Sequence, residues 1–273
     1  MPIESYPDQL EPANQDGVIW RFMNMTKFAD LMNTSELYFC RADLFEDKSE
    51  GLPPDNYFPF PNLHPLDVLD RRKIDDSIGC LAQFREAFYV NCWHLFRRET
   101  WGMWEKYGED GVAVCSRYGL LKSVLDAMND RAYIGLVRYG SRHMTGWNLF
   151  RFITTKRLEF ADELEVRAFL WIIDPRAGIN RHIDVDDRVH DRPLTPPPDR
   201  VLKGHRRKVD LQALINGIVV SPRASSKTLG EIEHLVKSKR YSIAVQPSAL
   251  TRFRELLPPS ESGRAVSKAS SKA

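Results

Sequence analysis

Three charged residues share one face of a predicted strand. In "FADELEVRAFLWIID", which begins at Phe160, the residues Glu163, Glu165 and Arg167 alternate with apolar residues, and the second half is almost wholly apolar. Alternate strand residues share a face and lie ~6.5–7 Å apart. Two carboxylates at that spacing raise one another's pKa, and an arginine holds one of them ionised. The pattern predicts a strand whose charged first part opens into a cleft. The alternative is a solvated, self-paired strand end.

A second candidate is the pair Cys92 and His94 in "VNCWHLF". On a strand these two share a face, and a cysteine beside a histidine can form a thiolate nucleophile. Neighbours two apart on one strand rarely reach hydrogen-bond geometry, and no orienting aspartate is evident. A structural role is therefore favoured for this pair.

Three further stretches are weaker candidates. "HIDVDDRVHD" has the residue types of a divalent-metal site, but polar turns use the same residues. "KGHRRK", from Lys203, could hold phosphate, although a solvated loop is favoured. The aromatic residues Trp101, Trp104 and Tyr107, at helical spacing, favour a core role over a stacking platform. We predict no metal site. The polar residues of the first stretch are His182, Asp184, Asp186, Asp187, His190 and Asp191.

Composition limits the class of protein. The 273 residues, 42% of them hydrophobic, allow one elaborated domain or two small ones. A net charge of +2 argues against nucleic acid and anionic membrane as partners. The first 17 residues contain acidic residues and prolines and no apolar core, so no signal peptide is expected, and no apolar run approaches membrane-spanning length. The cysteines form no CxxC pair and predict buried, reduced thiols in a cytoplasmic protein. They are Cys40, Cys80, Cys92 and Cys115.

The order of elements predicts an α+β fold. Strands are expected at 17–22, 37–43, 88–96, 110–118, 131–140, 160–173, 218–220 and 241–250. Helices are expected at 26–36, with Thr26 as N-cap, and at 97–108, 119–128 and 227–239, with mixed helical stretches at 65–87, 147–160 and 209–217. A Pro-rich loop covers 44–65 and a turn-rich stretch 174–200. Because regular βαβ alternation is absent, we predict a single elaborated domain around a mixed, mostly antiparallel sheet flanked by helices. It spans 17–258, between a flexible segment, 1–16, and a disordered tail, 259–273.

Several segments, in order, resemble the bacterial family known as domain of unknown function 2971. They include "WRFMN", the Phe45, Asp47 and Glu50 element, "VNCWHLFRRETWGMWEKYGEDGVAV", "KRLEFADELEVRAFL" and "VDLQALINGIVVSPRA". Together they cover about residues 17–250. Lys48 stands where the family usually has proline. The resemblance itself implies little about function.

A looser resemblance is to ADP-ribosyltransferase-like folds. These place an arginine or histidine on an early strand, a small or aromatic residue on the next, and a glutamate, often in Glu-x-Glu, on a later one. Arg21, then Tyr38 or Ser35, then Glu163 or Glu165 occur here in that order. The resemblance implies an NAD- or nucleotide-using transferase in which a carboxylate faces a developing positive charge.

Under this hypothesis Glu165 is the catalytic carboxylate, Glu163 its neighbour, and Arg21 contacts phosphate or ribose. NAD is the cofactor that the analogy suggests, and a small molecule or nucleotide is the expected ligand. The alternatives are a non-catalytic module that binds a ligand or partner, in stress response or phage defence, and hydrolytic or metal-dependent chemistry that uses His182 and the aspartates after it. The expected ligand-binding residues are Arg167, Tyr38, Asp47, Glu50, Trp93, His94 and Trp104.

Overall fold

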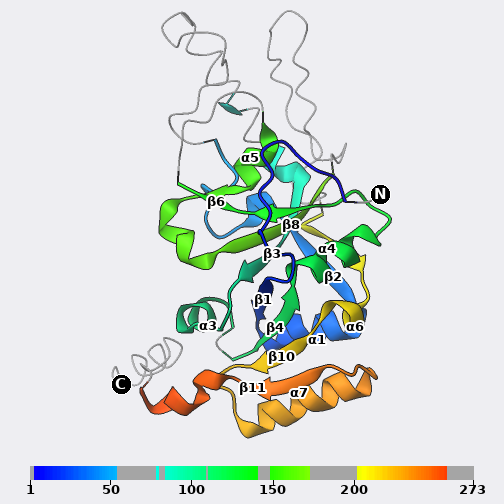
Figure 1. Cartoon of the computed structure of the whole chain (residues 1–273), viewed down its shortest axis with the longest axis vertical. Helices are drawn as coiled ribbons and strands as arrows, with labels where there is room; N and C mark the ends of the chain where they lie inside the picture. Colours follow the sequence, from blue (N-terminus) through cyan, green and yellow to red (C-terminus); the bar gives the residue numbers. More distant parts are fainter. Residues whose placement is uncertain are drawn as a thin grey trace, which may run out of the picture.

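The chain forms an α+β fold around a nine-stranded, mostly antiparallel sheet, as predicted. A computed structural model describes residues 3–53, 78–79, 84–108, 110–140, 148–172 and 202–256. The strand order is β11-β10-β4-β1-β3-β2-β9, with β8 beside β3 and β5 beside β8 (Figure 1). Within this sheet the described strands pair antiparallel except for β10 and β11. The strands are β1 (Val18–Met23), β2 (Glu36–Arg41), β3 (Phe88–Leu95), β4 (Val112–Arg117), β5 (Tyr133–Leu136), β8 (Glu165–Trp171), β9 (Gly204–Lys208), β10 (Gly217–Val220) and β11 (Ala244–Pro247).

The α-helices lie close to their predicted positions. They are α1 (Met25–Thr34), α3 (Trp101–Tyr107), α4 (Tyr118–Asp126), α5 (Leu149–Ile153), α6 (Leu211–Leu214) and α7 (Ser226–Ser238). The predicted cap of α1 was wrong by two residues. The Asn24 side chain, not that of Thr26, accepts the hydrogen bond from the Lys27 amide, because Asn24 has the extended backbone that an N-cap requires.

One predicted loop is a strand. The basic stretch from Lys203 forms the edge strand β9, which pairs with β2 from Glu36↔Lys208 to Cys40↔Gly204. Its charges fit a strand because two of them find acidic partners, Arg206 with Asp30 and Arg207 with Asp130. Charged residues on an edge strand also discourage pairing with other chains.

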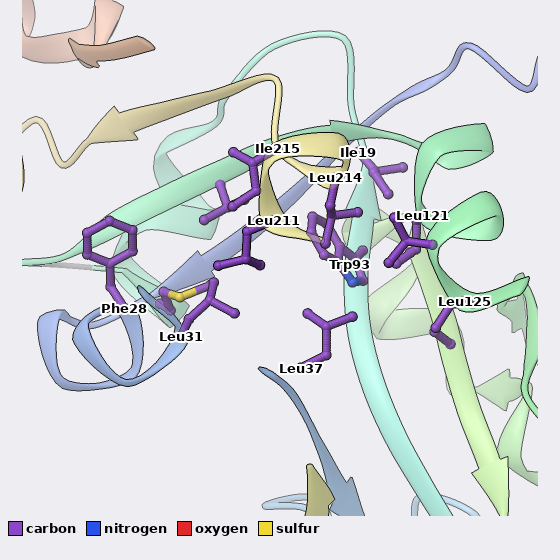
Figure 2. Close-up of a cluster of buried hydrophobic side chains, with 14 of the residues drawn as sticks. Ile19, Phe28, Leu31, Leu37, Trp93, Leu121, Leu125, Leu211, Leu214 and Ile215 are labelled. Carbon is purple, nitrogen blue, oxygen red and sulfur yellow. The ribbon is translucent and has the colours of Figure 1, made fainter. Parts of the chain in front are cut away.

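The main hydrophobic core lies on one face of the sheet. Leu121 and Leu125 of α4 and Leu211 and Leu214 of α6 converge on Trp93 of β3 (Figure 2). Phe28 and Leu31 of α1 and Ile232 and Val236 of α7 belong to the same cluster. Of the described helices, α1, α4, α6 and α7 therefore cover this face, and α7 lies along β11 at the bottom of Figure 1.

Two of the smaller apolar clusters formed by the described residues lie on the opposite face. One packs Trp20 and Phe22 of β1 against Trp104 of α3. The other packs Phe169 of β8 against Tyr6, which is buried. Residues 3–16, predicted as a flexible segment, thus lie against the domain, where the Glu4 amide also donates to the Ala132 carbonyl. The candidate site lies between these two clusters.

Some predictions concern residues outside the described ranges. These are most of the Pro-rich loop 44–65, most of the helical stretch 65–87, Cys80, the His/Asp stretch 182–191 and the tail 259–273. The other three cysteines are free, but they are half-buried where full burial was expected. A search of the described helices found none long and apolar enough to cross a membrane.

Candidate functional site

The charged stretch does not begin as a strand. Residues Leu158–Glu163 form the 3₁₀-helix η4, and β8 begins only at Glu165. Leu164, between them, has a φ of 41° in the left-handed region. The prediction of one continuous strand from Phe160 was therefore wrong at its start. The turn leaves the Leu164 side chain 48% exposed while Glu163 and Glu165 are both buried.

Solvent exposure along this segment is the reverse of that predicted. Glu163, Glu165 and Arg167 are 1%, 2% and 1% exposed, whereas Trp171 at the apolar end is 36% exposed. The charged end does not open into a cleft as a bare strand end would. Burial of charge is tolerated only with partners of opposite charge and satisfied hydrogen bonds. Those partners come from other segments of the chain.

Arg167 and Glu165 form a buried two-pronged ion pair. Arg167 Nε donates to Glu165 Oε1 and Arg167 Nη2 to Glu165 Oε2, each at 2.9 Å. The guanidinium also donates to the Ile153 carbonyl and forms an ion pair with Glu50. Planar guanidinium and carboxylate groups match in this arrangement, which fixes both side chains. Glu165 is thus held in place by its own strand.

Glu163 is bound by two lysines. Lys156, the last residue of the short strand β7 (Thr155–Lys156), donates to Glu163 Oε2 at 2.7 Å and to Glu165 Oε2 at 3.3 Å. Lys106 of α3 and the Tyr107 hydroxyl donate to Glu163 Oε1. Lys156 is buried, whereas the Lys106 side chain is 43% exposed. Glu163 Oε1 therefore lies beside a group that reaches solvent. The partners of the Glu165 carboxylate, Lys156 and Arg167, are buried.

Burial and pairing act in opposite directions on the pKa values. Burial alone would raise the pKa of Glu163, but hydrogen bonds from Lys106 and Lys156 outweigh it and the pKa is lowered. Burial would lower the pKa of Lys156, yet the two glutamates raise it above its usual value. Burial lowers the pKa of Arg167 to about 9, which leaves it a cation at neutral pH. The centre therefore keeps its charges at neutral pH through Lys156, Glu163 and Arg167.

Cys92 and His94 face this centre but do not form a nucleophile. Burial, reinforced by Glu165, raises the pKa of the Cys92 thiol well above its usual value. Burial lowers the pKa of His94 to about 4, and its Nδ1 donates to the Glu163 carbonyl at 2.9 Å. A protonated thiol beside a neutral imidazole holds no thiolate. The structural role favoured for this pair agrees with its geometry.

Glu50 is the other predicted residue that joins the centre directly. It pairs with Arg167 and lies 3.9 Å from Lys156 Nζ, and its side chain is only 8% exposed. Asp47 lies at the edge, where it binds Arg157 at 3.0 Å. The short element of Asp47 and Glu50 thus folds back onto the β8 charges.

Three predicted ligand-binding residues lie elsewhere. Trp93 belongs to the main core on the opposite face, where its Nε1 donates to Asn91 Oδ1 at 2.7 Å. Trp104 packs edge-to-face on Phe22 and donates to Glu99. Tyr38 lies on β2 with Arg206 over its ring. The two tryptophans point into the core because the side-chain periodicity of a strand and of a helix places them on the apolar face of each element.

Arg21 is also separate from the centre. In β1 it pairs with Val114 of β4, on the face that carries the main core. Burial lowers its pKa to about 10, and among the described residues no carboxylate binds its guanidinium. The predicted meeting of Arg21 with Glu163 and Glu165 does not occur.

Several groups that bind the two glutamates are not among the predicted site residues. Lys156, Lys106, Tyr107 and Tyr139 all contact Glu163 or Glu165, and the Tyr139 hydroxyl accepts from the Glu165 amide at 2.7 Å. Tyr107 had been considered only as a core residue. Because buried carboxylates need cations as partners, the sequence indicates that lysines or arginines must lie nearby. It does not indicate which lysine supplies the charge.

No established function is available by similarity. Among the described residues, no cluster of three or more His, Cys, Asp and Glu side chains suited to a metal ion is present. Comparison of the chain with protein-family models, curated proteins and solved structures found no match.

Proposed function

We propose that this chain is a nucleotide-using transferase, with NAD as the leading substrate, whose working carboxylate is Glu163. The observation that carries the proposal is the position of Glu163. Its carboxylate is buried and ionised, and the groups on its Oε1 are the partly exposed Lys106 and Tyr107. A fixed anion just below the surface is suited to stabilise positive charge that develops on a bound substrate.

The choice of Glu163 over Glu165 rests on access. Both Glu165 oxygens accept hydrogen bonds from Arg167, and one also accepts from Lys156, all of them buried. A substrate would have to break a fixed ion pair to reach that carboxylate. Glu165 is assigned a positioning role, because it holds the Lys156 ammonium that also binds Glu163.

The proposed step is substitution at the ribose carbon that carries nicotinamide. The carbon–nitrogen bond breaks and nicotinamide leaves with the bonding electron pair, which cancels its ring charge. The lone pair of an acceptor hydroxyl, or of water, forms the new bond, and the acceptor proton passes to solvent. Glu163 stabilises the oxocarbenium-like centre between these events. The proposal gives Arg21 no part in the step.

The test is nicotinamide release from labelled NAD by the purified protein. We expect release by the wild type and at least a hundredfold loss in Glu163→Gln, which keeps the shape of the side chain but removes its charge. Glu159→Gln, an exposed glutamate on the same 3₁₀-helix, is the matched control and should leave release unchanged. Absence of release, with no thermal shift on adding NAD, would dismiss the proposal.

A second candidate is a non-catalytic module that binds a ligand or partner. It is favoured by the hydrogen bonds at the centre, in which all four carboxylate oxygens of Glu163 and Glu165 already have donors. Under this candidate Glu163→Gln would leave biological activity intact, while changes to the exposed Leu158 and Leu164 would reduce it. The glutamine variant therefore separates the two candidates.

A further inference from the structure

The Lys106 ammonium lies in a site with the features of a receptor for organic cations. Its Nζ binds Glu163 Oε1, lies 4.7 Å from the centre of the Phe160 ring, and lies 5.3 Å from the centre of the Tyr107 ring. Two aromatic rings and a carboxylate around one positive charge form the arrangement in which proteins bind alkylammonium groups. We call Phe160, Tyr107 and Glu163 the cation cage.

We propose that Lys106 is a place-holder in this cage, and that the cage binds the cationic group of a small-molecule ligand, of the alkylpyridinium or alkylammonium class, when Lys106 leaves. The inference rests on the proposed function for the choice of a pyridinium ring. The geometry of the cage itself does not require group transfer.

Lys106 is suited to leave because its side chain is the more exposed of the two lysines that bind Glu163. Its side chain is 43% exposed, against 8% for Lys156, the second lysine that binds Glu163. The Lys106 ammonium faces solvent, so it regains hydration when it leaves, and the entering cation replaces it beside the buried Glu163 Oε1. Lys156 stays on Glu163 Oε2 and keeps the carboxylate in place and ionised.

The local charge favours a cation over an anion as the ligand. Lys156 and Arg157 also lie over the Phe160 ring, at 4.7 and 5.2 Å, but each is bound to carboxylates. Arg157 pairs with Asp47 and Glu159, and Lys156 pairs with Glu163 and Glu165. Once Lys106 leaves, the cage therefore carries the unmatched negative charge of one Glu163 oxygen. An anionic group would be repelled from that oxygen.

The test compares two probes of nearly equal shape, 1-methylnicotinamide, which is a cation, and nicotinamide, which is neutral. NMR titration gives the dissociation constant of each for four forms of the full chain: wild type, Lys106→Met, Lys106→Gln and Lys106→Arg. We expect the methionine and glutamine variants to bind 1-methylnicotinamide at least about fivefold more tightly than the wild type. The arginine variant, which keeps a cation in the cage, should bind as weakly as the wild type. Adding Phe160→Leu to Lys106→Met should reverse the gain.

The outcomes separate this inference from the proposed function. Equal constants in the methionine and arginine variants, or an equal gain for neutral nicotinamide, would overturn the cage. Cation binding without nicotinamide release from NAD would leave the cage standing and remove the transferase. Release from NAD by the wild type, with no gain in cation binding in the methionine and glutamine variants, would support the transferase and overturn the cage. Circular dichroism of each variant checks that the fold is retained.

Discussion

Lys156 joins the two glutamates that the sequence places two residues apart. Its ammonium lies 2.7 Å from Glu163 Oε2 and 3.3 Å from Glu165 Oε2, and all three side chains are buried. Like charges this close would raise each other's pKa, and the shared cation cancels that repulsion. A buried network of this kind is costly to desolvate, and removal of one member leaves the others uncompensated.

Removal of Arg167 is the first test of that network. We expect Arg167→Met to lower the free energy of unfolding by roughly 3–5 kcal/mol, because the buried carboxyl groups of Glu165 and Glu50 lose the cation that pairs with them. Urea denaturation measures the loss. Lys227→Ala, which breaks the exposed pair with Glu231, is the control and should change stability by less than about 0.5 kcal/mol. A loss below about 1 kcal/mol in Arg167→Met would contradict the buried pair.

His94 predicts an acid-sensitive fold. Burial lowers its folded-state pKa from 6.5 to about 4, so the unfolded chain binds a proton more readily. Stability from this residue is present above pH 6.5 and is lost as the pH falls towards 4, by about 2 kcal/mol between pH 7 and 5. Denaturation at several pH values should give a shallower dependence in His94→Gln than in the wild type. His234→Gln, at an exposed position on α7, is the matched control.

Leu164 tests the backbone turn between the two glutamates. Its φ of 41° lies where a side chain costs roughly 1–2 kcal/mol, and its own side chain is 48% exposed. Leu164→Gly should therefore keep or raise the melting temperature, since glycine removes the strain and loses little burial. Leu164→Ile should lower it, because branching at Cβ makes this conformation worse. If glycine lowered the temperature as much as isoleucine, the left-handed turn would be refuted.

Substitution of Arg21 is expected to raise the free energy of unfolding, whereas substitution of Arg167 is expected to lower it. Arg21 is partly buried, burial lowers its pKa to about 10, and no described carboxylate binds it. Because a partly desolvated cation without a carboxylate partner opposes folding, Arg21→Met should raise the free energy of unfolding by about 1 kcal/mol. Chemical denaturation checks the sign. A decrease of more than about 1 kcal/mol would mean that the guanidinium contributes an interaction to the folded state.

Local pattern was sufficient for most of the fold. The aromatic and β-branched residues of "FYVNCWHLF" predict β3, because such side chains fit a pleated sheet. The spacing of Phe28, Leu31 and Met32 predicts α1, because helical periodicity follows from backbone geometry. The α+β class follows from the order of such elements. The pattern also selected Glu163, Glu165 and Arg167 as unusual, since charges there interrupt a strand that is otherwise apolar.

Only the tertiary structure decided where those charges lie and what they meet. A strand pattern indicates which side chains share a face, but whether that face is exposed to solvent depends on the segments that pack on it. Here α3 supplies Lys106, β7 supplies Lys156 and the loop after β2 supplies Glu50. These contacts span between 7 and 117 residues of sequence, and Coulomb attraction acts through space rather than along the chain. The sequence by itself was enough to select Glu163, Glu165 and Arg167. The packing of distant segments decided that they form a buried ion-pair network with one exposed lysine, and not the wall of a cleft.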